Sequence, residues 1–128
     1  RTLQTCQEIF QTHPGVKIIA HDKVKEYPQG LQICNKRREK LDLEKQFPGI
    51  DFSGLDSESD EMWRDDRLEE IEELRERIEQ FKTMLQGLAE TNIAIVSHSA
   101  YLNQFLYGTL GDESNPLKHC HPYQLEME

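Results

Sequence analysis

The chain has 128 residues, of which 36% are hydrophobic and 30% are charged, so a single soluble domain is expected and roughly two-thirds of the unfolded surface can be buried. No apolar run approaches the about 20 residues that cross a bilayer, and we therefore expect no membrane partner. The formal net charge of −9 makes nucleic acid an unexpected partner as well.

The first elements in chain order are a helix and a strand. Apolar residues recur at helical spacing from Leu3 to Phe10, and His13-Pro14-Gly15 ends that pattern with a helix breaker and a flexible residue. The short β-branched run Val16–Ala20 then predicts a strand. A helix followed by a strand begins an α/β pattern.

The stretch 21–60 has weak periodicity and many turn residues, with a short helix predicted from Glu39 to Gln46. Long loops inside compact domains are functional or disordered, and this one has enough apolar side chains to anchor it. We interpret 21–60 as a cap-like insertion over a site, within a single domain spanning 1–128. Basic residues gather in 21–46, where they would steer an anionic small molecule, although ordinary solvated surface is the alternative.

The strongest periodic signal is an apolar stripe at spacings of three and four. Its members are Leu68, Ile71, Leu74, Ile78, Phe81, Leu85 and Leu88. The stripe predicts an amphipathic helix that ends near Gly87, in an acidic region where 56–80 holds twelve acids and four arginines. A helix packed on a sheet is favoured over a coiled-coil seam, because three heptads are few and a strand follows at once.

The apolar run Ile93–Val96 predicts a buried strand that ends at Ser97-His98-Ser99, and a helix over 100–107 follows. Open α/β sheets bind ligands at the carboxyl ends of their strands, and the start of a helix attracts anions. A histidine at such a place indicates phosphate chemistry, although a hydrogen-bonded structural histidine is commoner. A loop over 108–116 and a final strand within 117–127 complete the expected elements.

The cysteines indicate the redox compartment of the protein and bear on metal binding. Cys6, Cys34 and Cys120 are odd in number and widely spaced, which argues against a disulfide framework and favours the cytoplasm. His119 and His121 would share one face of a strand, but two ligands do not make a zinc site. We therefore expect no metal.

Two further side chains suit a phosphate site. Arg1 opens the first helix, and its planar guanidinium binds phosphate with two parallel hydrogen bonds. Glu26 follows the first predicted strand, where a carboxyl group can give a proton to a leaving oxygen. Taken singly, each is more commonly a solvated surface residue.

In combination these features resemble the histidine phosphatase, or phosphoglycerate mutase-like, superfamily, and within it the fungal and plant mutase-like branch. The pieces that carry the resemblance run in order along the chain: Arg1-Thr2-Leu3-Gln4-Thr5, Glu26, Cys34–Arg38, Phe47–Ser53, Trp63 and Ile95–Ser99. Val24, Lys25 and Ala100 depart from the residues that are usual at their positions.

The resemblance implies a three-layer α/β fold, in which a mostly parallel sheet has helices on both faces, and phosphoryl transfer through a phosphohistidine without a cofactor. It assigns Arg1 to the phosphate pocket, Glu26 to acid catalysis and His98 to the second histidine of the site. Ser99 stands beside His98 at the helix start, and Arg37, or alternatively Arg38, matches basic residues of the cap.

The nucleophilic histidine of that family lies in an Arg-His-Gly motif, which this sequence does not contain. The chain begins at Arg1 without Met, so we expect a fragment cut after the nucleophile, inactive alone, or a member that has lost it. A phosphatase or mutase-like domain acting on a phosphorylated small molecule is the leading hypothesis. A non-catalytic domain that binds a phosphorylated ligand or protein partner, and a coiled-coil protein built on 68–88, are the alternatives. The substrate, the oligomeric state and an upstream targeting signal stay open.

Overall fold

A computed structural model describes residues 1–111 and 117–128. The chain forms two compact units, one made of Arg1–Asp22 with Gln29–Leu68 and the other of Lys23–Pro28 with Glu69–Glu128. Each unit has its own hydrophobic core. Most of the 21–60 stretch belongs to the first unit, and its role as a cap within a single domain stays a prediction.

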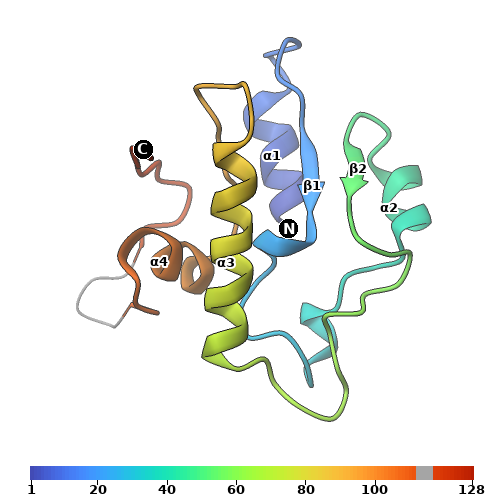
Figure 1. The fold of residues 1–128 in the computed structure, drawn as a ribbon. Coiled ribbons are helices and arrows are strands. Elements are labelled where there is room, and N and C mark those ends of the chain that lie inside the picture. Colours follow the sequence, from blue (N-terminus) through green and yellow to red (C-terminus); the bar gives the residue numbers. More distant parts are fainter. Residues whose placement is uncertain (112–116) are drawn as a thin grey trace. The chain divides into compact units, whose positions relative to one another are not determined.

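The first unit combines helices with a pair of short parallel strands (Figure 1). Its elements are α1 (Thr2–Phe10), β1 (Ile19–His21), the 3-10 helix η2 (Ile33–Asn35), α2 (Lys40–Gln46) and β2 (Asp51–Gly54), and the 3-10 helix η1 (Asp22–Val24) leads into the second unit. Ile19 lies opposite Asp51, His21 lies opposite Gly54, and α2 contacts β2. The predicted helices at 3–10 and 39–46 are confirmed.

Local chemistry explains why β1 and β2 approach closely. A Cβ on Gly54 would lie 2.4 Å from the carbonyl oxygen of Ala20, so only glycine fits this position of β2. At the other end of β2, hydrogen bonds from Ser53 and an ion pair with Lys17 at 3.1 Å lower the pKa of Asp51 to about 2. The core beneath is formed by Ala20, Leu43, Phe47, Ile50, Phe52 and Leu55.

The second unit is built on two helices, α3 (Ile71–Gln86) and α4 (Ser99–Tyr107), which pack against each other (Figure 1). Glu70 and Glu73 form a reciprocal capping box at the start of α3, which fixes where the helix begins. Gly108, with φ of +71°, ends α4 in the left-handed conformation that favours glycine. Both helices were predicted, and Gly87 is the residue that ends α3.

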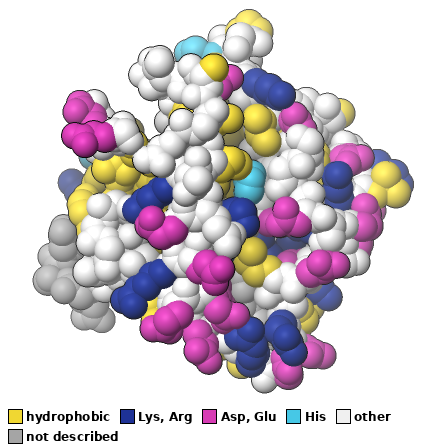
Figure 2. Space-filling view, in the orientation of Figure 1, with side chains coloured by type: hydrophobic (Ala, Val, Ile, Leu, Met, Phe, Trp, Pro, Cys, Tyr) yellow, Lys and Arg dark blue, Asp and Glu magenta, His cyan; other side chains and the backbone are white. Residues whose placement is uncertain are grey.

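The apolar stripe of α3 is covered from within the chain. Its buried members pack on α4, where Phe81 meets Phe105 edge to face with ring centroids 6.3 Å apart. The core comprises Leu74, Ile78, Phe81, Leu85, Tyr101 and Phe105. Most of the other side chains of α3 are charged and exposed to solvent (Figure 2), whereas Arg77 is buried. The stripe therefore packs within the core of this unit and does not form a coiled-coil seam.

Several strand predictions were wrong. Ile93–Val96 forms no strand, and Ile93 and Ala94 are exposed while Ile95 and Val96 are half-buried. Residues 117–128 form no strand either, the strand predicted at 16–20 is limited to Ile19–His21, and β2 was predicted as loop. An apolar run becomes a strand only when a second backbone accepts its hydrogen bonds, and in the described residues only β1 and β2 pair in this way.

Helices together with a parallel strand pair fit the expected α/β class. Of the predicted loop over 108–116, residues 112–116 lie outside the described part. No helix among the described residues has the length and apolarity that a bilayer crossing requires.

The α3–α4 contact gives a stability prediction. Leu74 is fully buried, whereas Leu88, just after the same helix, is 44% exposed. Leu74→Ala should lower the free energy of unfolding by about 2–5 kcal/mol, because it removes buried methyl groups and leaves a cavity. Leu88→Ala should change it by less than about 0.5 kcal/mol. Equal losses in denaturant unfolding followed by circular dichroism would show that α3 does not pack through Leu74.

Candidate functional site

His98 lies immediately before α4, with extended backbone, and its carbonyl accepts the first helical hydrogen bond from Leu102 at 2.9 Å. No strand holds this segment. Instead, the hydroxyl of Ser97 donates to the carbonyl of Val24 at 2.6 Å, and Ile95 packs on the core of the second unit. The hydrogen bond ties the residue before His98 to the segment that carries Glu26.

The structure brings His98 and Glu26 together. Nδ1 of His98 lies 3.4 Å from Oε2 of Glu26, and the two side chains are 20% and 29% exposed. At this distance a protonated imidazole forms an ion pair with the carboxylate, and both side chains are partly exposed to solvent. Contacts of this kind are commonly long without substrate and shorten in its complex. The pair suits proton transfer beside a bound anion.

Ser99 is the first residue of α4 and is exposed. Its carbonyl oxygen accepts a hydrogen bond from Nδ2 of Asn103 at 2.9 Å. The imidazole of His98 does not cap the helix with a hydrogen bond. The positive end of the helix dipole therefore lies next to the His98 and Glu26 side chains, where it favours negative charge.

Two charged residues of this unit escaped the sequence analysis. Arg77 of α3 and Glu69 are 6% exposed at their side chains, and Nε of Arg77 lies 2.6 Å from Oε1 of Glu69. Arg77 also donates to the carbonyl oxygens of Lys23 at 2.9 Å and Lys25 at 2.8 Å. The sequence did contain one indication that Arg77 is buried, because Arg77 stands three residues after Leu74, on the apolar stripe itself.

Tyr101 lies beside this ion pair. The Arg77 guanidinium sits 5.1 Å from the centre of the Tyr101 ring, and Phe105 stacks on the same ring with centroids 6.2 Å apart. Burial raises the pKa of the Tyr101 hydroxyl, so it stays neutral across the physiological range. The ring therefore supports the guanidinium without adding a charge to the site.

Arg1 is exposed and precedes α1 in the first unit. Its predicted place in a phosphate pocket with His98 and Glu26 stays a prediction, because those residues belong to the other unit.

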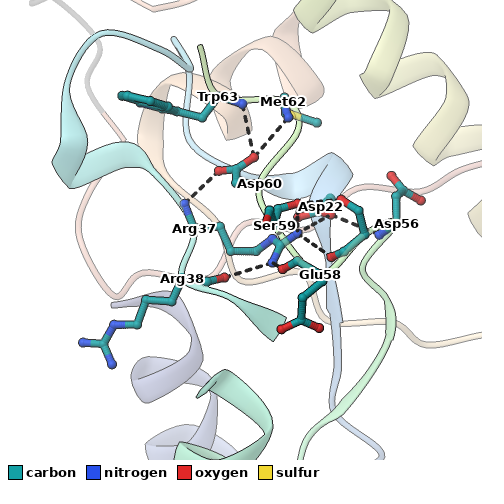
Figure 3. Close-up of polar contacts among 10 residues, drawn as sticks. Asp22, Arg37, Arg38, Asp56, Glu58, Ser59, Asp60, Met62 and Trp63 are labelled. Carbon is teal, nitrogen blue, oxygen red and sulfur yellow. Dashed lines mark hydrogen bonds and ion pairs between the residues drawn. The ribbon is translucent and has the colours of Figure 1, made fainter. Parts of the chain in front are cut away.

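Arg37 lies in a polar cluster of the first unit (Figure 3). Nε of Arg37 donates to Oδ1 of Asp22 at 2.8 Å, and these side chains are 8% and 7% exposed. Further guanidinium hydrogen bonds reach the carbonyl oxygens of Arg38, Ser57, Glu58 and Ser59. This geometry gives Arg37 a structural role, and phosphate binding by it stays a prediction.

The same cluster orders the segment that contains Trp63. Oδ2 of Asp60 accepts the backbone N–H of Arg37 at 2.7 Å, and Oδ1 accepts the N–H groups of Met62 and Trp63 (Figure 3). Arg38, the alternative to Arg37 in the cap, is exposed and bonds to Gln46.

In residues 1–111 and 117–128, no three His, Cys, Asp or Glu side chains are grouped to hold a metal ion. Of the His119-Cys120-His121 run, His121 packs edge-on against Tyr123 with ring centroids 4.9 Å apart.

Comparison with known proteins bears on this geometry. Residues 1–126 match the model of the histidine phosphatase superfamily (branch 1). The chain is 38% identical to phosphoglycerate mutase-like protein 1 of Arabidopsis thaliana over 82% of this chain and 34% of that protein. It is 33% identical to phosphoglycerate mutase-like protein 2 of the same plant over 69% of this chain and 25% of that protein. The chain thus spans about a third or less of these relatives, and no solved structure matches it.

The Arg37 cluster gives a prediction that separates a structural role from a ligand-binding one. Arg37→Ala leaves the buried Asp22 carboxylate without its ion-pair partner, so the free energy of unfolding should fall by about 3–5 kcal/mol. Arg38→Ala, an exposed neighbour, should change it by less than about 0.5 kcal/mol. Denaturant unfolding of both variants provides the measurement, and an Arg37→Ala protein as stable as the parent would contradict the structural role.

Proposed function

The chain belongs to the histidine phosphatase superfamily, and from that membership and the geometry of His98 and Glu26 we propose that it is part of a phosphoryl-transfer domain. The domain acts as a phosphomonoester phosphatase or mutase-like enzyme on a phosphorylated small molecule. It works through a phosphohistidine whose nucleophile lies outside residues 1–128. The observation that carries the proposal is the 3.4 Å contact between an imidazole and a carboxyl group beside a helix N-terminus.

The chemistry divides between the two side chains. The nucleophilic imidazole attacks phosphorus while the bond from phosphorus to the substrate oxygen breaks, and the Glu26 carboxyl group gives its proton to that oxygen. Protonated His98 and the N–H groups at the start of α4 stabilise the charge on the equatorial oxygens. The Glu26 carboxylate then takes a proton from the water that attacks the phosphohistidine, and inorganic phosphate leaves.

The proposal includes three finer points. Ser99 binds the phosphoryl group through the helix start, and Arg1 binds phosphate through its guanidinium. The complete domain has the three-layer fold, with helices on both faces of a mostly parallel sheet. The cysteines are free thiols, which supports a cytoplasmic location.

We expect His98→Ala to lower kcat for 4-nitrophenyl phosphate by about 100-fold or more in the full-length protein that carries this chain, the usual scale for one preorganised donor. His119→Ala replaces an exposed histidine of the same unit and should leave kcat unchanged. Phosphate release measured on both variants decides the matter. Turnover that survives His98→Ala would remove His98 from the site, and binding of phosphomonoester with no turnover in the parent would favour the non-catalytic alternative.

A further inference from the structure

We propose that Arg77 is a positioning residue for Glu26. Its buried ion pair with Glu69 holds the backbone of residues 23–26 in the conformation that places the Glu26 carboxyl group against His98. The inference rests on the proposed function of the Glu26 and His98 pair and adds a residue that touches neither substrate nor reacting atoms.

The guanidinium makes a complete set of hydrogen bonds. Nε and Nη2 donate to the two oxygens of Glu69 at 2.6 and 3.0 Å. Nη1 donates to the carbonyls of Lys23 and Lys25, and Nη2 donates to the carbonyl of Glu26 at 3.2 Å. An arginine has five N–H donors in a planar fork, and all five are used in these contacts. The orientation of the fork is therefore fixed by both its acid and its carbonyl partners.

The segment that is held has no strand partner of its own. Among the described residues, 23–26 lies outside the β1–β2 pair, so its carbonyl oxygens need other donors. Arg77 supplies them to Lys23, Lys25 and Glu26, and the Ser97 hydroxyl supplies one to Val24. The four carbonyl oxygens of residues 23–26 thus accept hydrogen bonds from two side chains, Arg77 and Ser97, and Ser97 directly precedes His98.

The stability of the unit alone does not account for such an arrangement. A buried ion pair is commonly no more stabilising than well-packed apolar residues of the same volume, so packing by itself gives no reason for a charge at this position. The pair does provide precise placement, because α3 is anchored in the core of the unit and the Tyr101 ring lies against the guanidinium. Displacing a reacting group by about 1 Å costs up to about 100-fold in rate.

The leaving group of the substrate provides the test. Nitrophenolate leaves without a proton, whereas the alkoxide of glycerol phosphate needs one. In the full-length protein, Glu26→Gln should therefore lower kcat/KM much more for glycerol phosphate than for 4-nitrophenyl phosphate. Arg77→Lys keeps the charge but loses the fork, and it should show the same selective loss, about 10-fold or more for glycerol phosphate.

Matched variants identify the cause. Arg75→Lys changes an exposed arginine of the same helix, 55% exposed at its side chain, and should leave both kcat/KM values unchanged. In the Glu26→Gln background, Arg77→Lys should cause no further loss, because the group that it positions is already absent. A folded Arg77→Lys protein whose loss is equal for both substrates, or multiplies with that of Glu26→Gln, would overturn the proposal.

A readout that does not depend on turnover separates this proposal from the proposed function. The ring resonances of His98 should shift in Glu26→Gln, shift in the same direction in Arg77→Lys and stay in place in Arg75→Lys. Unmoved resonances in Arg77→Lys overturn the positioning role whether or not the protein is an enzyme. If Arg77→Lys fails to fold, Glu69→Gln, which weakens the same pair and keeps its shape, replaces it and must give the same shifts.

Discussion

The placement of Glu26 in the second unit depends, in our proposal, on one buried interaction, the ion pair of Arg77 with Glu69. Burying two charges costs several kcal/mol per ion unless each finds full hydrogen bonding. In this unit the carboxylate takes two N–H groups and three backbone carbonyls take the others, so no guanidinium donor is left over. The apolar packing of α3 on α4 brings Arg77 to this place, and the fold thereby connects its core to the polar pair of Glu26 and His98.

The first unit uses the same physical device. Arg37 pairs with buried Asp22, and its guanidinium donates to carbonyls of residues 38 and 57–59. Both arginines bind backbone segments that have no strand beside them. A planar fork with five donors suits this purpose, because irregular backbone leaves several carbonyls close together and each needs a donor. In a longer sheet, backbone N–H groups of a neighbouring strand would donate to such carbonyl oxygens. In these described segments, a guanidinium that is paired with a carboxylate donates to them instead.

The sequence predicted the helices well because their periodicity is local. The stripe from Leu74 to Leu85 specifies α3 without reference to any other segment, and Gly87 ends it. Strands were predicted poorly, since pairing depends on distant backbone. Ile93–Val96 has the composition of a strand and forms none, whereas Asp51–Gly54 has turn residues and pairs with β1.

The sequence predicted only part of the candidate site, because contacts between distant residues again decide the rest. The resemblance selected Glu26 and His98, which lie in contact, but gave no indication of what holds them. Arg77 and Glu69 were hidden among the many charges of 56–80, where composition alone indicates a solvated face. Only the position of Arg77 on the apolar stripe distinguished it from Arg75. A charged residue on an otherwise apolar helix face is therefore the pattern to examine in such a chain.

The proposed function depends most on one bound oxyanion that lies beside the His98 and Glu26 pair of the second unit. A crystal structure of the full-length protein with vanadate, a mimic of the phosphoryl group in transfer, tests this directly. We predict that the His98 imidazole and the backbone N–H of Ser99 lie within hydrogen-bond distance of the vanadate, with the Glu26 carboxyl group on its leaving-oxygen side. Vanadate bound elsewhere, or bound with His98 and Glu26 directed away from it, would contradict the proposed function.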